Sequence, residues 1–336
     1  MLRTLSITIT VGAVLALGLV AAGPARATLV LTADGVTDGF ILSTFVGGYS
    51  FGAPTSTNYG PLAEGILPDG NVVTGSYANN TIYVFKDVDG QTLSSAVSAT
   101  PYTFGPGNGY YAMTTAGGQV YGAQQQGGPY EKFNNDGTHS PIPVPTATSA
   151  LGMWGDPVNG HIIAAAQQGL IDIDPVTGTF RVINPSLFPD GVTVSPDGLT
   201  AYIAVSGCVQ SYSITGAFTG LDVCVGHGPD GTGVISGGKF NGDVIVNNND
   251  GTVGLIDPTA GSEDIIANDG SRGDWVSPDT SNGTLFLSQI DEVARLSCGP
   301  GCTIGTPAAV PEPTSFALLG TALLGLGLVR RRRGMA

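Results

Sequence analysis

Positive charge is scarce in this chain. Its 336 residues include 12 Lys or Arg against 26 Asp or Glu, which gives a formal net charge of −14. Four of the basic residues, Arg330–Arg333, stand together near the end, so the rest of the chain is more acidic still. Such a surface would repel a phosphate backbone, and we expect no nucleic-acid binding. The acidity suits a protein that stays soluble outside the cell.

Long helical patterns are also missing. Between residues 28 and 305 no extended apolar stretch repeats with the 3.6-residue period of a helix. The sequence there is instead punctuated by many of the 52 Gly and 22 Pro residues and is rich in Val, Ile, Thr and Tyr. Short strands and tight turns are expected from this composition. With both ends set aside, the length predicts one large all-β domain, residues 28–305.

The first 27 residues have the order of parts of a secretion signal. Arg3 precedes an apolar stretch from Leu5 to Ala22, and Ala25-Arg26-Ala27 offers the small-x-small pattern that signal peptidase cleaves. We predict a signal peptide over residues 1–27 and a mature chain that begins at Thr28. The alternative is an N-terminal membrane helix that is retained.

Three elements follow one another at the opposite end, in residues 306–336. Pro311-Glu312-Pro313 precedes an apolar run from Ser315 to Val329, and Arg330, Arg331, Arg332 and Arg333 follow the run. The run is short for a bilayer of about 30 Å, and the Arg cluster is expected to stay on the cytoplasmic side. The order resembles the PEP-CTERM sorting signal. That resemblance implies a transmembrane helix over residues 315–329, removed by a membrane-embedded exosortase. A plain C-terminal anchor is the alternative.

Turn signals repeat between the two ends. A first Gly-containing marker recurs six times, at intervals of about 38 to 48 residues: Gly70, Gly118, Gly160, Gly198, Gly242 and Gly283. A second turn follows five of these markers after about 18 to 20 residues: Gly90, Gly137, Gly178, Gly216 and Gly261. Four strands in forty-odd residues make one propeller blade, so we predict a six-bladed β-propeller. A β-sandwich or a solenoid is the alternative.

The ring needs a strand from the other end of the chain. No clear fourth strand follows Leu296 in the last blade, whereas Thr28 to Thr32 reads as a strand without a hairpin partner. Pairing these two ends would remove the open edge of the sheet, and we expect the ring to close in this way.

Four cysteines in an exported chain predict two disulfides. Cys208 and Cys224 are symmetric about the turn at Gly216, so they should face one another across adjacent strands. Cys298 and Cys302 flank a Gly-Pro-Gly sequence and would close a small loop. The spacing of the four cysteines offers no paired zinc knuckles, so we reject zinc binding as their role.

Familiar catalytic and metal motifs are weak. Gly48–Gly52 matches G-x-S-x-G but has no strand-to-helix context. The residues His139, His161 and His227 share no metal-binding spacing, and Asp87–Gly90 lacks the later ligands of a calcium loop, so we interpret it as a turn.

One set of residues is placed to face the central channel. The positions before the innermost strands hold Glu64, Asp190 and Asp230, and also Arg272. Together with the sequence Pro189–Gly198, these loosely resemble the channel motifs of the gluconolactonase and senescence-marker family. That resemblance implies a divalent metal, Ca²⁺, held by Glu64, Asp190 and Asp230, and the opening of sugar lactones by metal-activated water. The chain departs from the family in having Asp190 for Asn and Ser206 where an acid is expected. Turn chemistry alone also accounts for the Asp-Gly pairs.

The sequence therefore predicts an exported propeller, anchored in the membrane and then displayed at the cell surface or in an extracellular polysaccharide matrix. We expect it to bind carbohydrate or protein rather than to catalyse, with signal peptidase and exosortase as processing partners and no confident cofactor. The alternative is a metal-dependent lactonase or lyase, since propellers host many activities.

Overall fold

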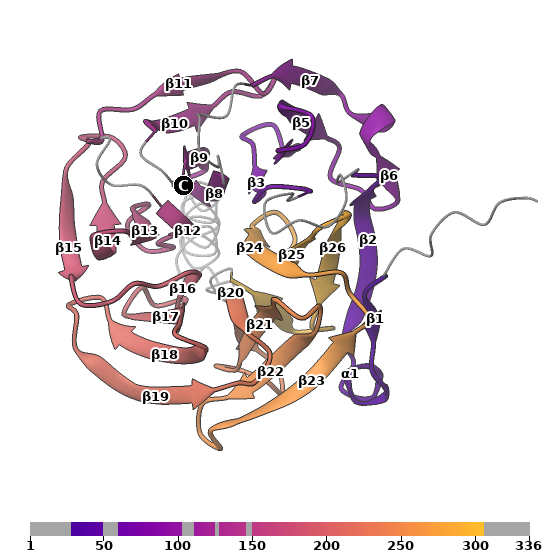
Figure 1. Ribbon diagram of the computed structural model, residues 1–336, viewed down its shortest axis with the longest axis vertical. Helices are drawn as coiled ribbons and strands as arrows, with labels where there is room; N and C mark the ends of the chain where they lie inside the picture. Colours follow the sequence, from indigo (N-terminus) through magenta and orange to yellow (C-terminus); the bar gives the residue numbers. More distant parts are fainter. Residues whose placement is uncertain (1–27, 50–59, 103–110, 125–127, 146–149, 306–336) are drawn as a thin grey trace, which may run out of the picture.

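The computed structural model describes residues 28–49, 60–102, 111–124, 128–145 and 150–305. Six mainly antiparallel sheets stand as blades around a central axis, as Figure 1 shows. The prediction of an all-β, six-bladed propeller is confirmed. Within the described residues no helix is long and apolar enough to cross a membrane. The predicted signal peptide 1–27 and transmembrane helix 315–329 lie outside those residues.

The blades have a common order of strands, from the axis to the rim. The strands of blades one to three are β3 (Gly65–Ile66), β4 (Val72–Ser76), β5 (Thr81–Phe85) and β7 (Ser98–Pro101); β8 (Tyr111–Ala116), β9 (Gln119–Gln124), β10 (Tyr130–Phe133) and β11 (His139–Pro141); and β12 (Ala150–Gly155), β13 (Ile162–Ala166), β14 (Gly169–Ile173) and β15 (Phe180–Asn184).

The other three blades follow in the second half of the chain. Their strands are β16 (Val192–Val194), β17 (Thr200–Val205), β18 (Cys208–Ser213) and β19 (Phe218–Cys224); β20 (Pro229–Gly237), β21 (Val244–Asn248), β22 (Val253–Asp257) and β23 (Ser262–Asn268); and β24 (Gly273–Asp279), β25 (Thr284–Gln289) and β26 (Glu292–Ser297) with β2 (Ile41–Gly47). The remaining elements are β1 (Val30–Leu31), α1 (Ala33–Thr37), β6 (Gln91–Thr92), the 3₁₀ helix Leu93–Ser95 and β27 (Cys302–Ile304).

The repeated Gly markers lie at the turns that they predict. The first marker of each blade joins its first and second strands, and the second marker joins its third and fourth strands. Gly198, with a φ of 71°, shows why the residue type matters, because a side chain is strained in that conformation. The spacing of left-handed turns is therefore what made the blades visible in the sequence.

Ring closure differs from the prediction in the strand that performs it. The predicted strand Thr28–Thr32 supplies only β1, which pairs through two residues with β23 at the rim of blade five. The chain then turns through α1, whose N-cap Thr32 accepts a hydrogen bond from the Gly35 amide. The next strand, β2, becomes the outer strand of blade six by antiparallel pairing with β26. The longer strand closes the ring because it offers six paired residues and buries Phe45 and Val46.

Blades pack face to face, so their inner strands are covered on both sides. All five residues of β13 and all five of β14 are buried, whereas the rim strand β15 is mostly exposed. The run Ile162–Ala166 is therefore apolar throughout and lacks the alternation of apolar and polar residues that marks a half-exposed strand.

Both predicted disulfides are present. Cys208 and Cys224 are directly paired residues of β18 and β19, with Cα atoms 3.8 Å apart. The bond between Cys298 and Cys302 joins Cα atoms 5.7 Å apart and closes the loop that leads into β27. No free cysteine remains in the described residues.

Replacing Cys208 and Cys224 together by Ser is expected to lower the free energy of unfolding by about 3 kcal/mol, because a loop of about 16 residues loses its cross-link. Denaturant unfolding under oxidising conditions measures the difference. A loss well under about 1 kcal/mol would contradict the expectation.

Candidate functional site

Three acidic residues from consecutive blades meet at one mouth of the channel. Asp190 precedes β16, Asp230 lies near the start of β20, and Asp274 lies near the start of β24. The pairing register shifts at both Asp230 and Asp274, and such bulges turn a side chain out of the regular alternation. Asp190 and Asp230 line a cavity of about 10 Å³, room for about one water molecule.

Glycines allow the innermost strands to crowd together at this mouth. A Cβ atom on Gly191 would lie 2.0 Å from the Asp230 carbonyl oxygen, and one on Gly231 would lie 2.7 Å from the Asp274 carbonyl oxygen. The Asp-Gly pairs seen in the sequence therefore have a packing reason that requires no metal.

Burial raises the pKa of all three carboxyl groups at the mouth, and Asp190 adds to the effect at Asp230 and Asp274. Burial raises the pKa of Asp230 well above its usual range, and Asp274 and Asp190 raise it further. Burial raises the pKa of Asp274 to about 7. At the exposed rim, partial desolvation raises the pKa of Asp190 while Arg272 lowers it. The Arg272 guanidinium lies 3.9 Å from Asp230, and its Nε donates to the Asn249 side chain at 2.5 Å. We call these three acids and Arg272 the acidic mouth.

Glu64 lies apart from that cavity, between blades one and six. Its side chain is fully buried and accepts a hydrogen bond of 2.8 Å from the Ser288 hydroxyl, while its amide donates to the Ser277 hydroxyl. Its second carboxyl oxygen, Oε2, has no hydrogen-bond partner. Burial raises the Glu64 pKa to about 8, so the group is largely protonated at neutral pH.

The acidic residues of the mouth are possible ligands for a divalent cation. Carboxylate oxygens are suitable donors for Ca²⁺, and Asp274 Oδ2 is buried without a hydrogen-bond partner. Yet in the part of the chain that the structure describes, the one group of three acidic, Cys or His ligand atoms within 4.8 Å of one another is Cys208, Asp222 and Cys224, and its cysteines form a disulfide. The donors suit the ion, but their geometry is not that of a closed site.

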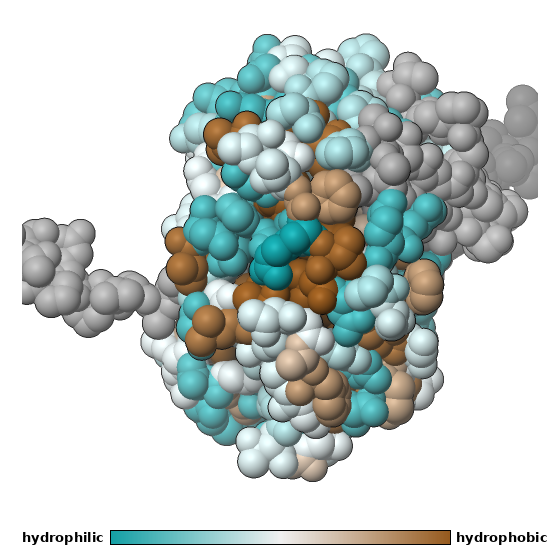
Figure 2. Space-filling model, turned by 90° about the vertical axis from the view of Figure 1, so that its left-hand side faces the viewer, coloured by the Kyte–Doolittle hydropathy of each residue, from teal (hydrophilic) through white to brown (hydrophobic). Residues whose placement is uncertain are grey.

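The three histidines each pair with a carboxylate. His139 lies 3.0 Å from Glu131, His161 lies 2.8 Å from Asp172, and His227 lies 2.5 Å from Asp250. His161 stands at a shallow hollow of about 170 Å³ beside β15. Figure 2 shows the side of the propeller on which β15 lies, where strongly hydrophilic residues stand next to hydrophobic ones.

Arg295 gives the turn Asp87–Gly90 a structural role. It forms ion pairs with Asp87, with Asp89 at 3.2 Å and with Asp279 at 3.3 Å. Asp87 and Asp89 therefore anchor blade one to Arg295 of blade six. In the G-x-S-x-G match, Ser50 lies outside the described residues.

Sequence reasoning missed Asp274. It chose Arg272 as the blade-six counterpart of Asp230, whereas the packing of Gly191 on Asp230 and of Gly231 on Asp274 makes Asp274 the counterpart. The Asp-Gly signal fails there because Trp275 follows Asp274, and the bulge hides the register.

Stability should fall as pH rises from about 5 to 8. Glu64 and Asp274 have folded pKa values above their unfolded ones, so the folded state holds more protons in this window and loses stability as they leave. Glu64→Gln should flatten part of this slope. Melting temperatures across the range measure it, and identical slopes for wild type and variant would contradict the assignment of the raised pKa.

The end of the chain gives a direct match to a known signal. Residues 309–333 match the family model of the PEP-CTERM protein-sorting motif. The chain carries a PEP-CTERM sorting motif. It is therefore an exported propeller with an exosortase processing signal. No curated protein matches the chain in sequence.

Solved structures share the fold of the propeller that carries this motif. A gluconolactonase from Xanthomonas campestris is 13% identical, with 82% of this chain and 97% of that chain covered and a TM-score of 0.56. The PQQ-bound aldose sugar dehydrogenase of Streptomyces coelicolor is 11% identical, with 79% and 99% covered and a TM-score of 0.54. At these identities the likeness concerns the propeller fold alone.

Proposed function

We propose that the protein is a display module, which the signal peptide 1–27 exports and the helix 315–329 anchors until exosortase removes it. The propeller of residues 28–305 then binds a ligand at the cell surface or in the extracellular matrix. The PEP-CTERM motif over residues 309–333 carries this proposal, because it addresses the propeller to the surface and leaves the fold free to present loops.

The acidic mouth favours binding over catalysis. Its cavity of about 10 Å³ is far smaller than the several hundred Å³ of a usual small-molecule site. Hydroxyl-rich polysaccharide or a basic patch of a surface protein can meet Asp190 and Arg272 at the rim without entering the channel.

Deleting Pro311-Glu312-Pro313 in the producing bacterium tests the proposal. We expect the variant to accumulate in the membrane fraction with its tail intact, while the wild type reaches the surface or the medium. The melting temperature of the soluble domain should not change. Equal surface levels of both proteins would contradict the role of the motif.

A Ca²⁺-dependent lactone hydrolase is the second candidate, and the position of Asp190, Asp230 and Asp274 at one mouth favours it, because carboxylate oxygens are suitable ligands for Ca²⁺. Metal analysis of the purified domain and melting with Ca²⁺ or a chelator test it, on wild type, Glu64→Gln and Asp230→Asn. A calcium-dependent rise in melting temperature that Asp230→Asn loses and Glu64→Gln keeps, together with hydrolysis of sugar lactones, would replace the binding proposal, because Glu64 lies apart from the acidic mouth. No response to Ca²⁺ would remove this candidate.

A further inference from the structure

The described chain ends on the axis of the propeller, at the mouth opposite the acidic one. β27 pairs with the last residues of β20, Ile235–Gly237, whereas Asp230 lies near the beginning of the same strand. The Gly305 amide donates to the Val234 carbonyl oxygen at 2.8 Å. A nine-residue strand such as β20 spans about 27 Å, so the two mouths lie at the opposite ends of a channel.

Contacts from three blades hold this end of the chain. A Cβ atom on Gly305 would lie 2.3 Å from the Trp154 ring of blade three and 3.0 Å from Pro278 of blade six. Ile304 is fully buried and pairs with Ile235 of blade five. The Cys298–Cys302 disulfide fixes the loop that brings β27 back to the axis. β27 therefore lies against the axis of the channel at this end.

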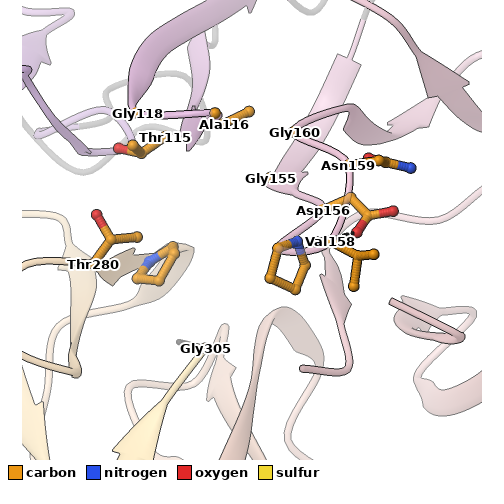
Figure 3. A pocket seen from close by; sticks show the side chains of 13 residues that line it. Thr115, Ala116, Gly118, Gly155, Asp156, Val158, Asn159, Gly160, Thr280 and Gly305 are labelled. Carbon is orange, nitrogen blue, oxygen red and sulfur yellow. Dashed lines mark hydrogen bonds between the residues drawn. The ribbon is translucent and has the colours of Figure 1, made fainter. Parts of the chain in front are cut away.

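Gly305 also lines a hollow of about 490 Å³ that the ends of the inner strands surround, as Figure 3 shows. Ala116 of blade two, Asp156 and Val158 of blade three, and Thr280 of blade six line the same hollow. We call the face around it the tail face. Asp69, Asp136 and Asp197 lie exposed in turns that join strands at this end of the blades.

We propose that the propeller is attached to the membrane through the chain end that lies on its axis. The tail face then points toward the membrane and the acidic mouth points away from it. The inference rests on the proposed anchoring through residues 315–329. Nine residues, 306–314, separate Gly305 from the apolar run and span about 30 Å at most. This is too short for the tail to pass around the blades to the other face. The turn aspartates disfavour close contact with anionic lipid. The domain therefore stays at a distance from the membrane surface, with its acidic mouth exposed to the surroundings.

Two Asn residues in exposed turns give a matched pair of probes. Asn159 lies in the turn between β12 and β13 on the tail face, and Asn79 lies in the turn between β4 and β5 on the opposite face. In the full chain, spin labels at Ala308→Cys with Asn159→Cys should be closer than labels at Ala308→Cys with Asn79→Cys. The expected difference is at least about 10 Å, a part of the roughly 27 Å along β20. Equal distances would overturn the proposal that the chain leaves the propeller at the tail face.

The orientation is measured with the full chain in phosphatidylcholine vesicles whose headgroups carry a quencher. A fluorophore at Asn159→Cys should be quenched more strongly than one at Asn79→Cys. Equal or reversed quenching in vesicle-bound protein would overturn the orientation and leave the anchoring proposal standing. A chain that does not bind vesicles would overturn the anchoring, and the orientation with it.

Discussion

Removing residues 28–47 should abolish the single cooperative unfolding transition of the propeller. β2 pairs with β26 over most of its length and carries the buried Phe45, so its loss opens the ring between blades six and one. The exposed edge of β26 would then be free to pair with other chains, and we expect aggregation as well. Thermal unfolding followed by circular dichroism, together with light scattering, measures both effects.

A shorter truncation provides the control. Removing residues 28–38 deletes β1 and α1 but leaves β2 in place, and β1 contributes only two paired residues to blade five. This variant should keep one transition at a modestly lower melting temperature. If both truncations unfolded alike, or if the longer one still melted cooperatively, the assignment of β2 as the closing strand would be wrong.

Arg295→Ala should lower the free energy of unfolding by about 3–5 kcal/mol, the usual cost of removing one partner of a buried ion pair. The Arg295 side chain is only 11% exposed, and Asp279 beside it is fully buried. Its guanidinium also lies 4.9 Å from the Phe45 ring centre and 5.0 Å from that of Phe286. The substitution leaves Asp279 charged without its partner, so the melting temperature should fall by on the order of 10 °C.

Lys239→Ala is the control, because the Lys239 side chain is 67% exposed and pairs at 2.6 Å with Asp38, which is itself partly exposed. Exposed ion pairs contribute about 0–1 kcal/mol, so this variant should melt close to the wild type. Similar losses for the two variants would show that burial does not set the strength of the Arg295 cluster.

Turn chemistry explains why so much of the propeller could be read from the sequence. Left-handed turns such as that at Gly198 demand Gly, and their spacing records the lengths of the strands between them. The pairing of Cys208 with Cys224 followed from the same turn geometry. The closing strand could not be read in this way, because β1 and β2 both precede the first marker. Only long-range pairing with β23 and β26 distinguishes them.

The acidic mouth was only partly predictable, for a related reason. Asp190 and Asp230 stand before Gly and are visible as pairs, and each Gly is needed where neighbouring strands crowd. Asp274 lies in a bulge without a following Gly, so its local sequence carries no such mark. Glu64 shares the Glu-Gly pattern, yet its bond to Ser288 depends on how blade six packs against blade one.

The mass of the protein recovered from its own bacterium tests the account most directly. We predict a mature chain that begins at Thr28, carries both disulfides, and has lost Ser315 and all residues after it through cleavage at or near Pro311-Glu312-Pro313. Recovery of the chain with Arg330–Arg333 still attached at the cell surface would contradict the account of an exosortase-processed display propeller.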